Sequence, residues 1–494
     1  MSNIRVRFAP SPTGMLHIGG LRTALYNYLF SRHHEGAFVL RIEDTDQKRY
    51  VAEAENDIIE SLHWAGMPFD EGPGKEGQYG PYRQSERSEL YHKYATQLIE
   101  QEQAYYAFDS TADIEDMRAR LQKSGNPSPK YDAITRMSMK NSLTLPAEEV
   151  RRRLDSGEEY VVRLKVPRRE TIRFKDDIRG FVSFESQGLD DQVLLKSDGL
   201  PTYHLANVVD DHLMDISHVI RGEEWLSSAP KHILLYQYLG WEPPAMAHLP
   251  LIMSPKGGKL SKRNADELGI PVNVRDYVEQ HYEPEALINF LAFLGWSPGD
   301  DREVFTMDQL IKEFSLERIG KGGAIFNHSK LIWYNEHFLR GIPEEILLPK
   351  VRSLAEEAGY TGFSDEYLKE VIRLMKERAS LLPDFVTHGR YFFEEPKEYD
   401  DKTVKKAWKN GTSDLVKAFH DQIKEMDEDS FKAAELKQVL SGLVEEHGIG
   451  FGKLMQPVRL AVTGMGFGPD LFETMQLLGK HKVTGRLDKA VQVL

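Results

Sequence analysis

A histidine followed by two glycines is the first group of residues in this sequence that could bind a ligand. His17-Ile18-Gly19-Gly20 comes after Pro10–Gly14, a segment whose prolines and glycine forbid helix and strand. Histidine can donate a hydrogen bond, and glycine lets a ligand lie close to the backbone. A phosphate site at a helix N-terminus is therefore one interpretation. The other is an ordinary turn with a surface histidine, because the common glycine-rich phosphate fingerprints are absent.

A second candidate group is a pair of lysines in a glycine-rich loop. Lys259 and Lys262 belong to the stretch Lys259–Arg263, which follows Gly257 and Gly258. Lysines on a mobile loop can close on a polyphosphate and neutralise charge that develops at its α-phosphate. Taken alone, the stretch is more typical of a solvated surface loop.

A strand and a helix must position the histidine. Residues 4–8 alternate between apolar and charged side chains, which predicts a short strand. Between Leu21 and Leu29 apolar residues recur every three and four positions, which predicts a helix that ends at about Arg32. Strand, turn and helix in this order present free backbone N–H groups where a phosphate could bind.

A second strand is predicted over residues 36–42, and it is apolar enough for a buried parallel position. It places Glu43 and Asp46 at its C-terminal end, where open α/β sheets bind their ligands. Carboxylates there could bind an ammonium group or a ribose hydroxyl, or cap the next helix. We assign the binding role to Glu43 and the capping role to Asp46, with the next helix over residues 51–64.

The rest of the sequence is less regular until its last third. Residues 104–202 combine helices, proline breaks and short strands, which suggests an inserted domain. The first sheet is expected to resume at residues 192–195, and helix is expected over residues 274–294. After Arg340 the apolar spacing is almost entirely helical, and no strand-rich barrel pattern is present.

Composition limits the class of protein. The 494 residues exceed the size of one core, so about three to five domains are expected. The sequence has no long apolar run and no N-terminal signal pattern, so a cytoplasmic protein without membrane association is expected. Without cysteine it cannot form disulfides or thiolate metal sites, so no zinc is expected. The net charge of −14 disfavours RNA overall, although local basic clusters such as Arg151–Arg153 remain candidates for it.

The two candidate groups together resemble the HIGH and KMSKS signatures of class I aminoacyl-tRNA synthetases. The strings RFAPSPTG, RIEDTD, GPYRQSER, PTYHLANVVDDH and VIRGEEW narrow the resemblance to glutamyl-tRNA synthetases of the bacterial type. The likeness covers nearly the whole chain. Gly20 replaces the final histidine of the first signature, a departure that glutamyl enzymes commonly show, and it leaves more of the phosphate-binding role to His17.

This resemblance implies an α/β plus all-α architecture. A Rossmann-type class I synthetase catalytic domain with an inserted acceptor-binding domain would be followed by a helical stem-contact region and an α-helical anticodon-binding domain. The boundaries it suggests are 1–103 and 203–255 for the catalytic halves, 104–202 for the insertion, 256–340 for the KMSKS loop and stem contacts, and 341–494 for the anticodon region.

It also implies a two-step reaction. Glutamate attacks the α-phosphorus of ATP, and the terminal ribose of tRNA(Glu) then takes the glutamyl group from the adenylate. Neither step needs a protein nucleophile, so catalysis would come from positioning and charge stabilisation. The implied partners are L-glutamate, ATP with Mg²⁺ and tRNA(Glu), and a monomer is expected.

Site residues follow from the motif positions. Arg7 would bind the side-chain carboxylate of glutamate, and Arg221 the α-carboxylate, because a guanidinium suits a carboxylate bidentately. The remaining glutamate-binding residues would be Glu43 at the ammonium, with Ser11, Tyr203 and Asn207. The implied ATP-binding residues are His17, Gly19, Glu224, Trp225, Leu251 and Ile252 through backbone groups, Lys259 and Lys262; His17 and the two lysines would also be catalytic.

One further residue concerns the anticodon. Arg378 matches an arginine position that separates glutamate from glutamine anticodons in some bacterial members. Two alternatives remain for the function: a non-discriminating form that also charges tRNA(Gln), and an adenylyltransferase that shares the HIGH-like turn. The helical last third of the chain argues against the adenylyltransferase.

Overall fold

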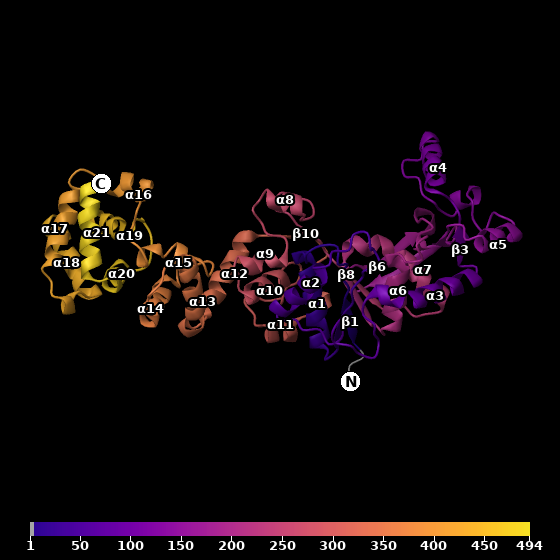
Figure 1. The fold of residues 1–494 in the computed structure, drawn as a ribbon, viewed down its shortest axis with the longest axis horizontal. Helices are drawn as coiled ribbons and strands as arrows, with labels where there is room; N and C mark the ends of the chain where they lie inside the picture. The colour runs from indigo at the N-terminus through magenta and orange to yellow at the C-terminus, as the bar shows by residue number, and fades with distance from the viewer. Residues whose placement is uncertain (1–3) are drawn as a thin grey trace. The chain divides into compact units, whose positions relative to one another are not determined.

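The structure is a computed structural model that describes residues 4–494, apart from the side chain of Lys262. The chain forms two compact units (Figure 1). The first consists of the residues up to Tyr277 together with Ile288–His328, and the second of Val278–Leu287 with Ser329–Leu494. Within the described residues, every helix is too short or too polar to cross a membrane.

The N-terminal strand, turn and helix form as the sequence predicts. Strand β1 (Arg5–Phe8) pairs in parallel with β2 (Ala37–Leu40), with Arg7 opposite Val39. Helix α1 (Ile18–His33) ends one residue after its predicted end. Both strands bury their last three residues, and α1 is buried along most of its length, so this motif lies inside the unit rather than on its surface.

A four-stranded sheet with the order β6-β5-β9-β8 lies beside this motif. Strand β1 is linked to the residue just before β8, because the Ser217 N–H donates to the Arg5 carbonyl at 2.9 Å. Strands β8 and β9 are parallel, whereas β5 and β6 form an antiparallel hairpin that joins β9 at the single pair Asp176 and Met246. The strand bounds are β5 (Thr171–Asp176), β6 (Gly180–Glu185), β8 (His218–Gly222) and β9 (Ala245–Leu249).

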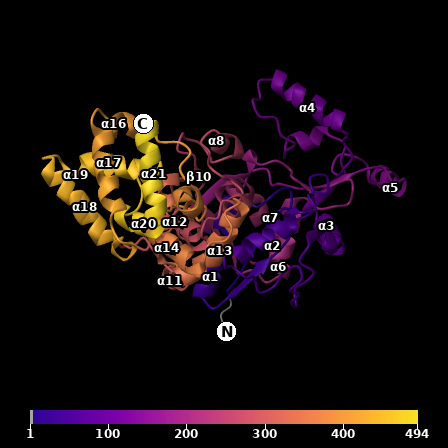
Figure 2. The ribbon, with the colours of Figure 1, turned by 60° about the vertical axis from the view of Figure 1, so that its left-hand side comes forward.

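The prediction that the first sheet resumes at residues 192–195 is wrong. Strand β7 (Val193–Leu195) exists, but it pairs with β4 (Val161–Leu164) in a separate sheet, β3-β4-β7, in which β3 covers Ala104–Ala107. A short apolar run indicates a buried strand and carries no information about its partner. In Figures 1 and 2, the inserted helix α4 (Thr111–Lys123) lies at the outer edge of the first unit.

Two helix predictions also need correction. Asp46 does not cap the next helix, because α2 (Ala54–Trp64) begins eight positions later and Asp46 pairs instead with Arg49 at 2.7 Å. The helix expected over residues 274–294 is interrupted, since His281 has a φ of 58°. The chain forms α9 (Val274–Glu279) and α10 (Pro284–Ala292) instead.

The other elements of the first unit surround these sheets. The helices are α3 (Ser88–Glu100), α5 (Ala147–Asp155), α6 (Tyr203–Leu213), α7 (Ala229–Leu239), α8 (Lys262–Asp266) and α11 (Met307–Glu313), with short 3₁₀ helices at Gln84–Arg87, Thr135–Ser138, Ser186–Gly188, Glu223–Ser228 and Leu316–Arg318. Strand β10 (Ile252–Met253) pairs in parallel with β11 (Ala324–Ile325). Helices α3, α6 and α7 share one hydrophobic core with β4 and β7, so the inserted sheet packs directly on these three helices.

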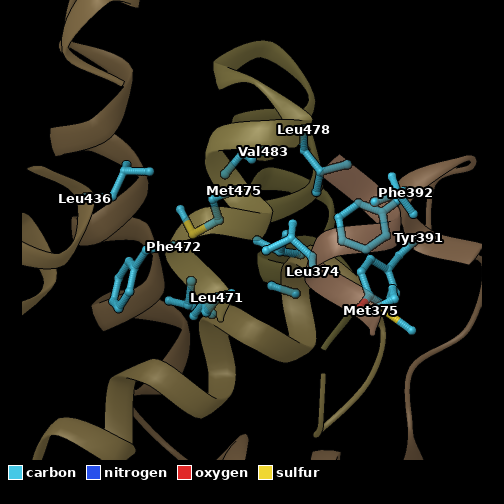
Figure 3. Packing of buried hydrophobic residues seen from close by; sticks show 14 of the residues in the cluster. Leu374, Met375, Tyr391, Phe392, Leu436, Leu471, Phe472, Met475, Leu478 and Val483 are labelled. Carbon is cyan, nitrogen blue, oxygen red and sulfur yellow. Dashed lines mark hydrogen bonds between the residues drawn. The ribbon is translucent and has the colours of Figure 1, made fainter. Parts of the chain in front are cut away.

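The second unit is helical, as predicted for the last third of the chain. Its helices are α12 (His328–Gly341), α13 (Glu344–Glu357), α14 (Asp365–Met375), α15 (Asp384–Thr387), α16 (Asp401–Ala407), α17 (Thr412–Lys424), α18 (Ala433–Glu446), α19 (Phe451–Thr463), α20 (Leu471–Leu478) and α21 (Lys480–Val493), with 3₁₀ turns at Arg390–Phe392 and Glu428–Ser430. Figure 3 shows Leu374, Tyr391, Met475 and Val483 among the buried side chains of this core. Residues with three-four spacing thus converge on one apolar interior.

Candidate active site

A cavity of about 250 Å³ opens where β1, β2 and β8 end and where α1 and α6 begin. This is the sheet edge at which open α/β folds bind ligands. All six residues predicted to bind glutamate line it, together with three of those predicted to bind ATP: Arg7, Ser11, Glu43, Tyr203, Asn207, Arg221, Gly19, Glu224 and Trp225. The geometry therefore gathers most of the predicted site around one volume.

The predicted phosphate donor His17 is the N-cap residue of α1. Its Nδ1 accepts a hydrogen bond from the Gly19 N–H at 3.0 Å, so the proton of the neutral ring lies on Nε2 and can be donated. Burial lowers the pKa of His17, and the charge of Lys259 lowers it further, which favours this neutral form. His17 itself is not among the residues that line the cavity.

Arg7 is buried and already paired. Its Nε donates to Asp211 Oδ1 at 2.9 Å and its Nη2 to Asp211 Oδ2 at 3.2 Å. Arg41 donates to the same carboxylate at 2.7 Å. With the Asn207 amide oriented so that its oxygen faces the guanidinium groups, this oxygen accepts from Arg7 and Arg41, each at 3.2 Å. Asp211 therefore fixes Arg7 and leaves Nη1 of Arg7 for a ligand.

Glu43 is held by the same group of charges. It accepts from Arg41 Nη2 at 3.1 Å, and both residues are buried. Burial raises the pKa of Glu43, while Arg41 and Arg7 oppose that rise by favouring the carboxylate. The anion can thus persist at the cavity wall although water is largely excluded from it.

Sequence reasoning missed Arg41, Asp210 and Asp211. Asp210 accepts from Gln84 at 2.9 Å, Arg87 at 2.7 Å and Tyr91 at 2.8 Å, so it ties α3 to α6. The available signal was helical spacing: on α6, Asp210 and Asp211 follow Asn207 by three and four residues and therefore share its face. Two adjacent buried carboxylates on one helix require cations from elsewhere, and the chain supplies three arginines.

Arg221 differs from Arg7 and Arg41 because it contacts no carboxylate of the described residues. It is 4% exposed, and it donates from Nη1 to the Tyr203 hydroxyl at 3.0 Å and from Nε to His248 at 3.1 Å. His232 Nδ1 lies 3.2 Å from the same Nη1. Nη2 of Arg221 is buried without any hydrogen-bond partner in the described part of the chain. A buried cation in this state lacks an anion.

An aromatic pair and an ion pair border the cavity. The Tyr203 and Trp225 rings lie 4.1 Å apart, and Trp225 is 38% exposed. Lys259 Nζ is 3.1 Å from Glu224 Oε1, and both side chains are about half exposed. Lys259 follows Gly257 and Gly258, whose positive φ values of 94° and 74° suit glycine in a tight turn. The side chain of Lys262 lies outside the described residues.

The remaining predicted residues lie away from the cavity. The Leu251 N–H donates to Glu223 at 2.9 Å, the Leu251 carbonyl accepts from Ala324 at 3.0 Å, and the Ile252 carbonyl accepts from Leu260 at 2.8 Å. These backbone groups are thus engaged within the protein. Arg378 belongs to the second unit, where it is exposed just after α14. Among the described residues, no cluster of three or more histidines and carboxylates is arranged to hold a metal ion.

Comparison with known proteins identifies the family. The sequence model described as "tRNA synthetases class I (E and Q), catalytic domain" matches residues 3–333, and one described as "Anticodon binding domain" matches residues 346–491. The glutamate–tRNA ligase of Cytophaga hutchinsonii is 49% identical, over 99% of this chain and 98% of the relative. That of Christiangramia forsetii is 48% identical, over 100% and 99% respectively.

A solved structure agrees with these sequences. The crystal structure of a glutamate tRNA ligase from Elizabethkingia meningosepticum in complex with its amino acid matches with a TM-score of 0.92 and 44% identity, and the match covers 100% of both chains. The predicted fold class, a class I catalytic domain followed by a helical anticodon-binding domain, is confirmed, and the adenylyltransferase alternative is not favoured. The chain therefore belongs to the glutamate–tRNA ligases, a family of class I aminoacyl-tRNA synthetases.

Proposed function

We propose that the cavity binds L-glutamate through Arg7 and Arg221 and activates it with ATP for transfer to tRNA(Glu). The observation that carries this assignment is the state of Arg221, which is buried at the cavity wall without a carboxylate partner among the described residues. A substrate carboxylate would supply the acceptor that Nη2 lacks. Arg7 is held by Asp211 and keeps Nη1 for the second carboxylate.

The other lining residues complete the recognition of glutamate. Glu43 binds the ammonium group, and its charge is maintained by Arg41. Ser11, Tyr203 and Asn207 provide hydroxyl and amide groups around the substrate. Glutamine is rejected because its amide cannot form the charged pair with Arg7 that the side-chain carboxylate forms.

ATP binds beside glutamate at the start of α1. His17 donates from Nε2 and Gly19 allows close approach of the phosphates. Lys259 and Lys262 attend the phosphates, and Glu224 and Trp225 lie near the adenosine. The Leu251 and Ile252 carbonyls each accept one bond within the protein and read the adenine edge with their second lone pair. Mg²⁺ would accompany the ATP and help to neutralise its phosphate charge.

The chemistry then requires positioning rather than a protein nucleophile. A carboxylate oxygen of glutamate attacks the α-phosphorus, pyrophosphate leaves, and the terminal ribose hydroxyl of tRNA attacks the glutamyl carbonyl with release of AMP. Arg221 and Arg7 hold the attacking carboxylate in line with the α-phosphorus. Such positioning raises the rate of reactions of this kind by several orders of magnitude. The lysines stabilise the charge that develops at the α-phosphate.

The proposal also assigns roles to the segments of the chain outside the cavity. We propose that residues 104–202 bind the acceptor end of tRNA, residues 256–340 carry the KMSKS loop and stem contacts, and residues 341–494 read the anticodon with Arg378. Residues 1–103 and 203–255 form the catalytic halves. A cytoplasmic monomer remains the expected state.

The direct test is charging of purified tRNA(Glu) and tRNA(Gln), each with labelled glutamate, ATP and Mg²⁺. We expect tRNA(Glu) to be charged. Charging of tRNA(Gln) as well would identify a non-discriminating enzyme and would contradict the role given to Arg378. Charging of neither tRNA would overturn the proposed function.

Lys259→Ala should lower the rate of glutamate activation about 100-fold or more, because a charge that acts mainly in the transition state is lost. The KM for glutamate should change little. Stability should also change little, since the Lys259–Glu224 pair is exposed. The measurement is pyrophosphate exchange with tRNA present. Lys256→Ala is the matched control on the same loop, where Lys256 faces Glu267 at 3.5 Å. An increased KM with an unchanged rate would argue against a transition-state role.

A further inference from the structure

The guanidinium of Arg221 is held by histidines instead of carboxylates. Its Nε donates to His248 Nε2 at 3.1 Å, and its Nη1 lies 3.2 Å from His232 Nδ1. Arg221 and His248 are cross-strand partners in the register of β8 and β9. His248 is fully buried, and its Nδ1 lies 2.6 Å from Oδ2 of Asp176, which is also fully buried.

The direction of each hydrogen bond follows from the chemistry of arginine, which can only donate. His248 Nε2 must therefore accept, and the ring proton must lie on Nδ1, where it is donated to Asp176. The second branch is ordered in the same way. His232 Nδ1 accepts from Arg221, so His232 Nε2 donates to His204 Nδ1 at 3.1 Å. Burial lowers the pKa of His248 and of His232, which agrees with neutral rings.

We propose that Asp176 is a positioning residue for glutamate binding: through His248 it selects the tautomer that accepts from Arg221, and so it holds the guanidinium toward the substrate carboxylate. Asp176 itself touches neither the cavity nor Arg221. The proposal rests on the proposed role of Arg221 and adds a residue that none of the motif positions indicates.

An imidazole between the two charges has a clear physical use. A carboxylate in direct contact with Arg221 would occupy two of its nitrogens, as Asp211 does at Arg7, and would weaken its attraction for a substrate anion. The relay, the hydrogen-bonded chain Asp176–His248–Arg221, keeps the guanidinium fixed while the carboxylate of Asp176 stays one imidazole ring away. Among the nitrogens of Arg221, only Nη2 then lacks a partner in the described part of the chain, so the guanidinium is both fixed in position and able to donate to a ligand.

Asp176→Asn tests the relay while it preserves the local turn. Oδ1 of Asp176 accepts from the N–H groups of Ile178 at 3.0 Å and Arg179 at 2.8 Å, and an asparagine oxygen can retain both bonds. The asparagine NH₂ must then face His248 Nδ1, so Nδ1 accepts and the ring proton moves to Nε2. The N–H donors of His248 Nε2 and Arg221 Nε would then face each other. We expect the KM for glutamate to rise about 10-fold to 100-fold, the cost of losing a hydrogen bond to a charged group. The KM for ATP should stay near the wild-type value.

The double variant Asp176→Asn/His248→Ala separates tautomer control from packing. Without the imidazole there is no ring tautomer for residue 176 to select, so the double variant should have a KM for glutamate no higher than that of His248→Ala alone. A structural defect would instead make the double variant worse than either single variant. Should Asp176→Asn fail to fold, His248→Gln and His248→Ala provide the same comparison, with the glutamine variant expected to keep the lower KM for glutamate.

Asp191→Asn is the matched control. Asp191 is fully buried and accepts from Tyr105 at 2.5 Å and Arg136 at 3.0 Å, but it lies in the inserted sheet region and has no contact with Arg221. Equal effects of Asp176→Asn and Asp191→Asn on the two KM values, or no effect of Asp176→Asn, would overturn the relay. If Arg221 did not bind glutamate, a variant of Arg221 would bind glutamate normally. This outcome can be distinguished from failure of the relay alone.

Discussion

Arg221→Met is expected to lower kcat/KM for glutamate about 30-fold to several thousand-fold, the usual cost of removing one partner of a buried charge pair. The loss should appear when glutamate is varied in pyrophosphate exchange with tRNA present, while the KM for ATP changes little. The same variant should unfold at a temperature close to that of the wild type, because no ion pair with a described residue is broken. The lost hydrogen bonds to Tyr203, His232 and His248 are offset by removal of a buried, unpaired charge.

Arg163→Met is a suitable control for this experiment. Arg163 is also a buried arginine without a salt bridge to a described residue, and it donates to the Asp191 carbonyl at 3.0 Å and lies over the Tyr131 ring. It belongs to the inserted sheet, so glutamate activation should continue in its variant. A wild-type KM for glutamate in Arg221→Met, measured with ATP and tRNA at saturation, would contradict the assignment of Arg221 to glutamate binding.

The sequence predicts the N-terminal part of the cavity lining well, because those residues lie at strand ends and at a helix start that the local periodicity already indicates. The N-terminal strand, turn and helix have distinct periodicities, and the ends of two parallel strands place Arg7 and Glu43 at one edge. The remaining lining residues, Tyr203, Asn207 and Arg221, were identified through the family motifs. Periodicity alone would not have assigned them to the same cavity.

What the sequence could not predict is how the charges are paired. Asp211 reaches Arg7 across 204 residues and His248 reaches Asp176 across 72. Such pairs depend on strand order and register, which short apolar runs do not encode. The misplaced strand β7 has the same cause, since its sequence fits either sheet. Asp46 was misassigned because a carboxylate after a strand suits a cap, a surface ion pair or a ligand equally well.

Arg7→Met should combine a loss of function with a loss of stability, which distinguishes it from Arg221→Met. Removal of the guanidinium breaks a buried, two-bond pair with Asp211, so we expect the free energy of unfolding to fall by about 3 kcal/mol, at the lower end for buried pairs. The lower end applies because Arg41 still contacts Asp211 at 2.7 Å. Glutamate activation should be lost, with ATP binding largely retained.

The two effects of Arg7 can be separated with a second substitution. In Arg7→Met/Asp211→Asn the carboxylate that keeps only Arg41 as its cation is neutralised, so a small part of the lost stability should return, because Arg41 still pairs with Glu43. Activity should not return, because the side-chain carboxylate of glutamate still lacks its partner. Thermal unfolding and pyrophosphate exchange with glutamate and glutamine, measured on both variants, provide the comparison. Recovery of glutamate activation in the double variant would mean that Arg7 acts only by neutralising Asp211, and the side-chain carboxylate of glutamate would have to be assigned to another cation.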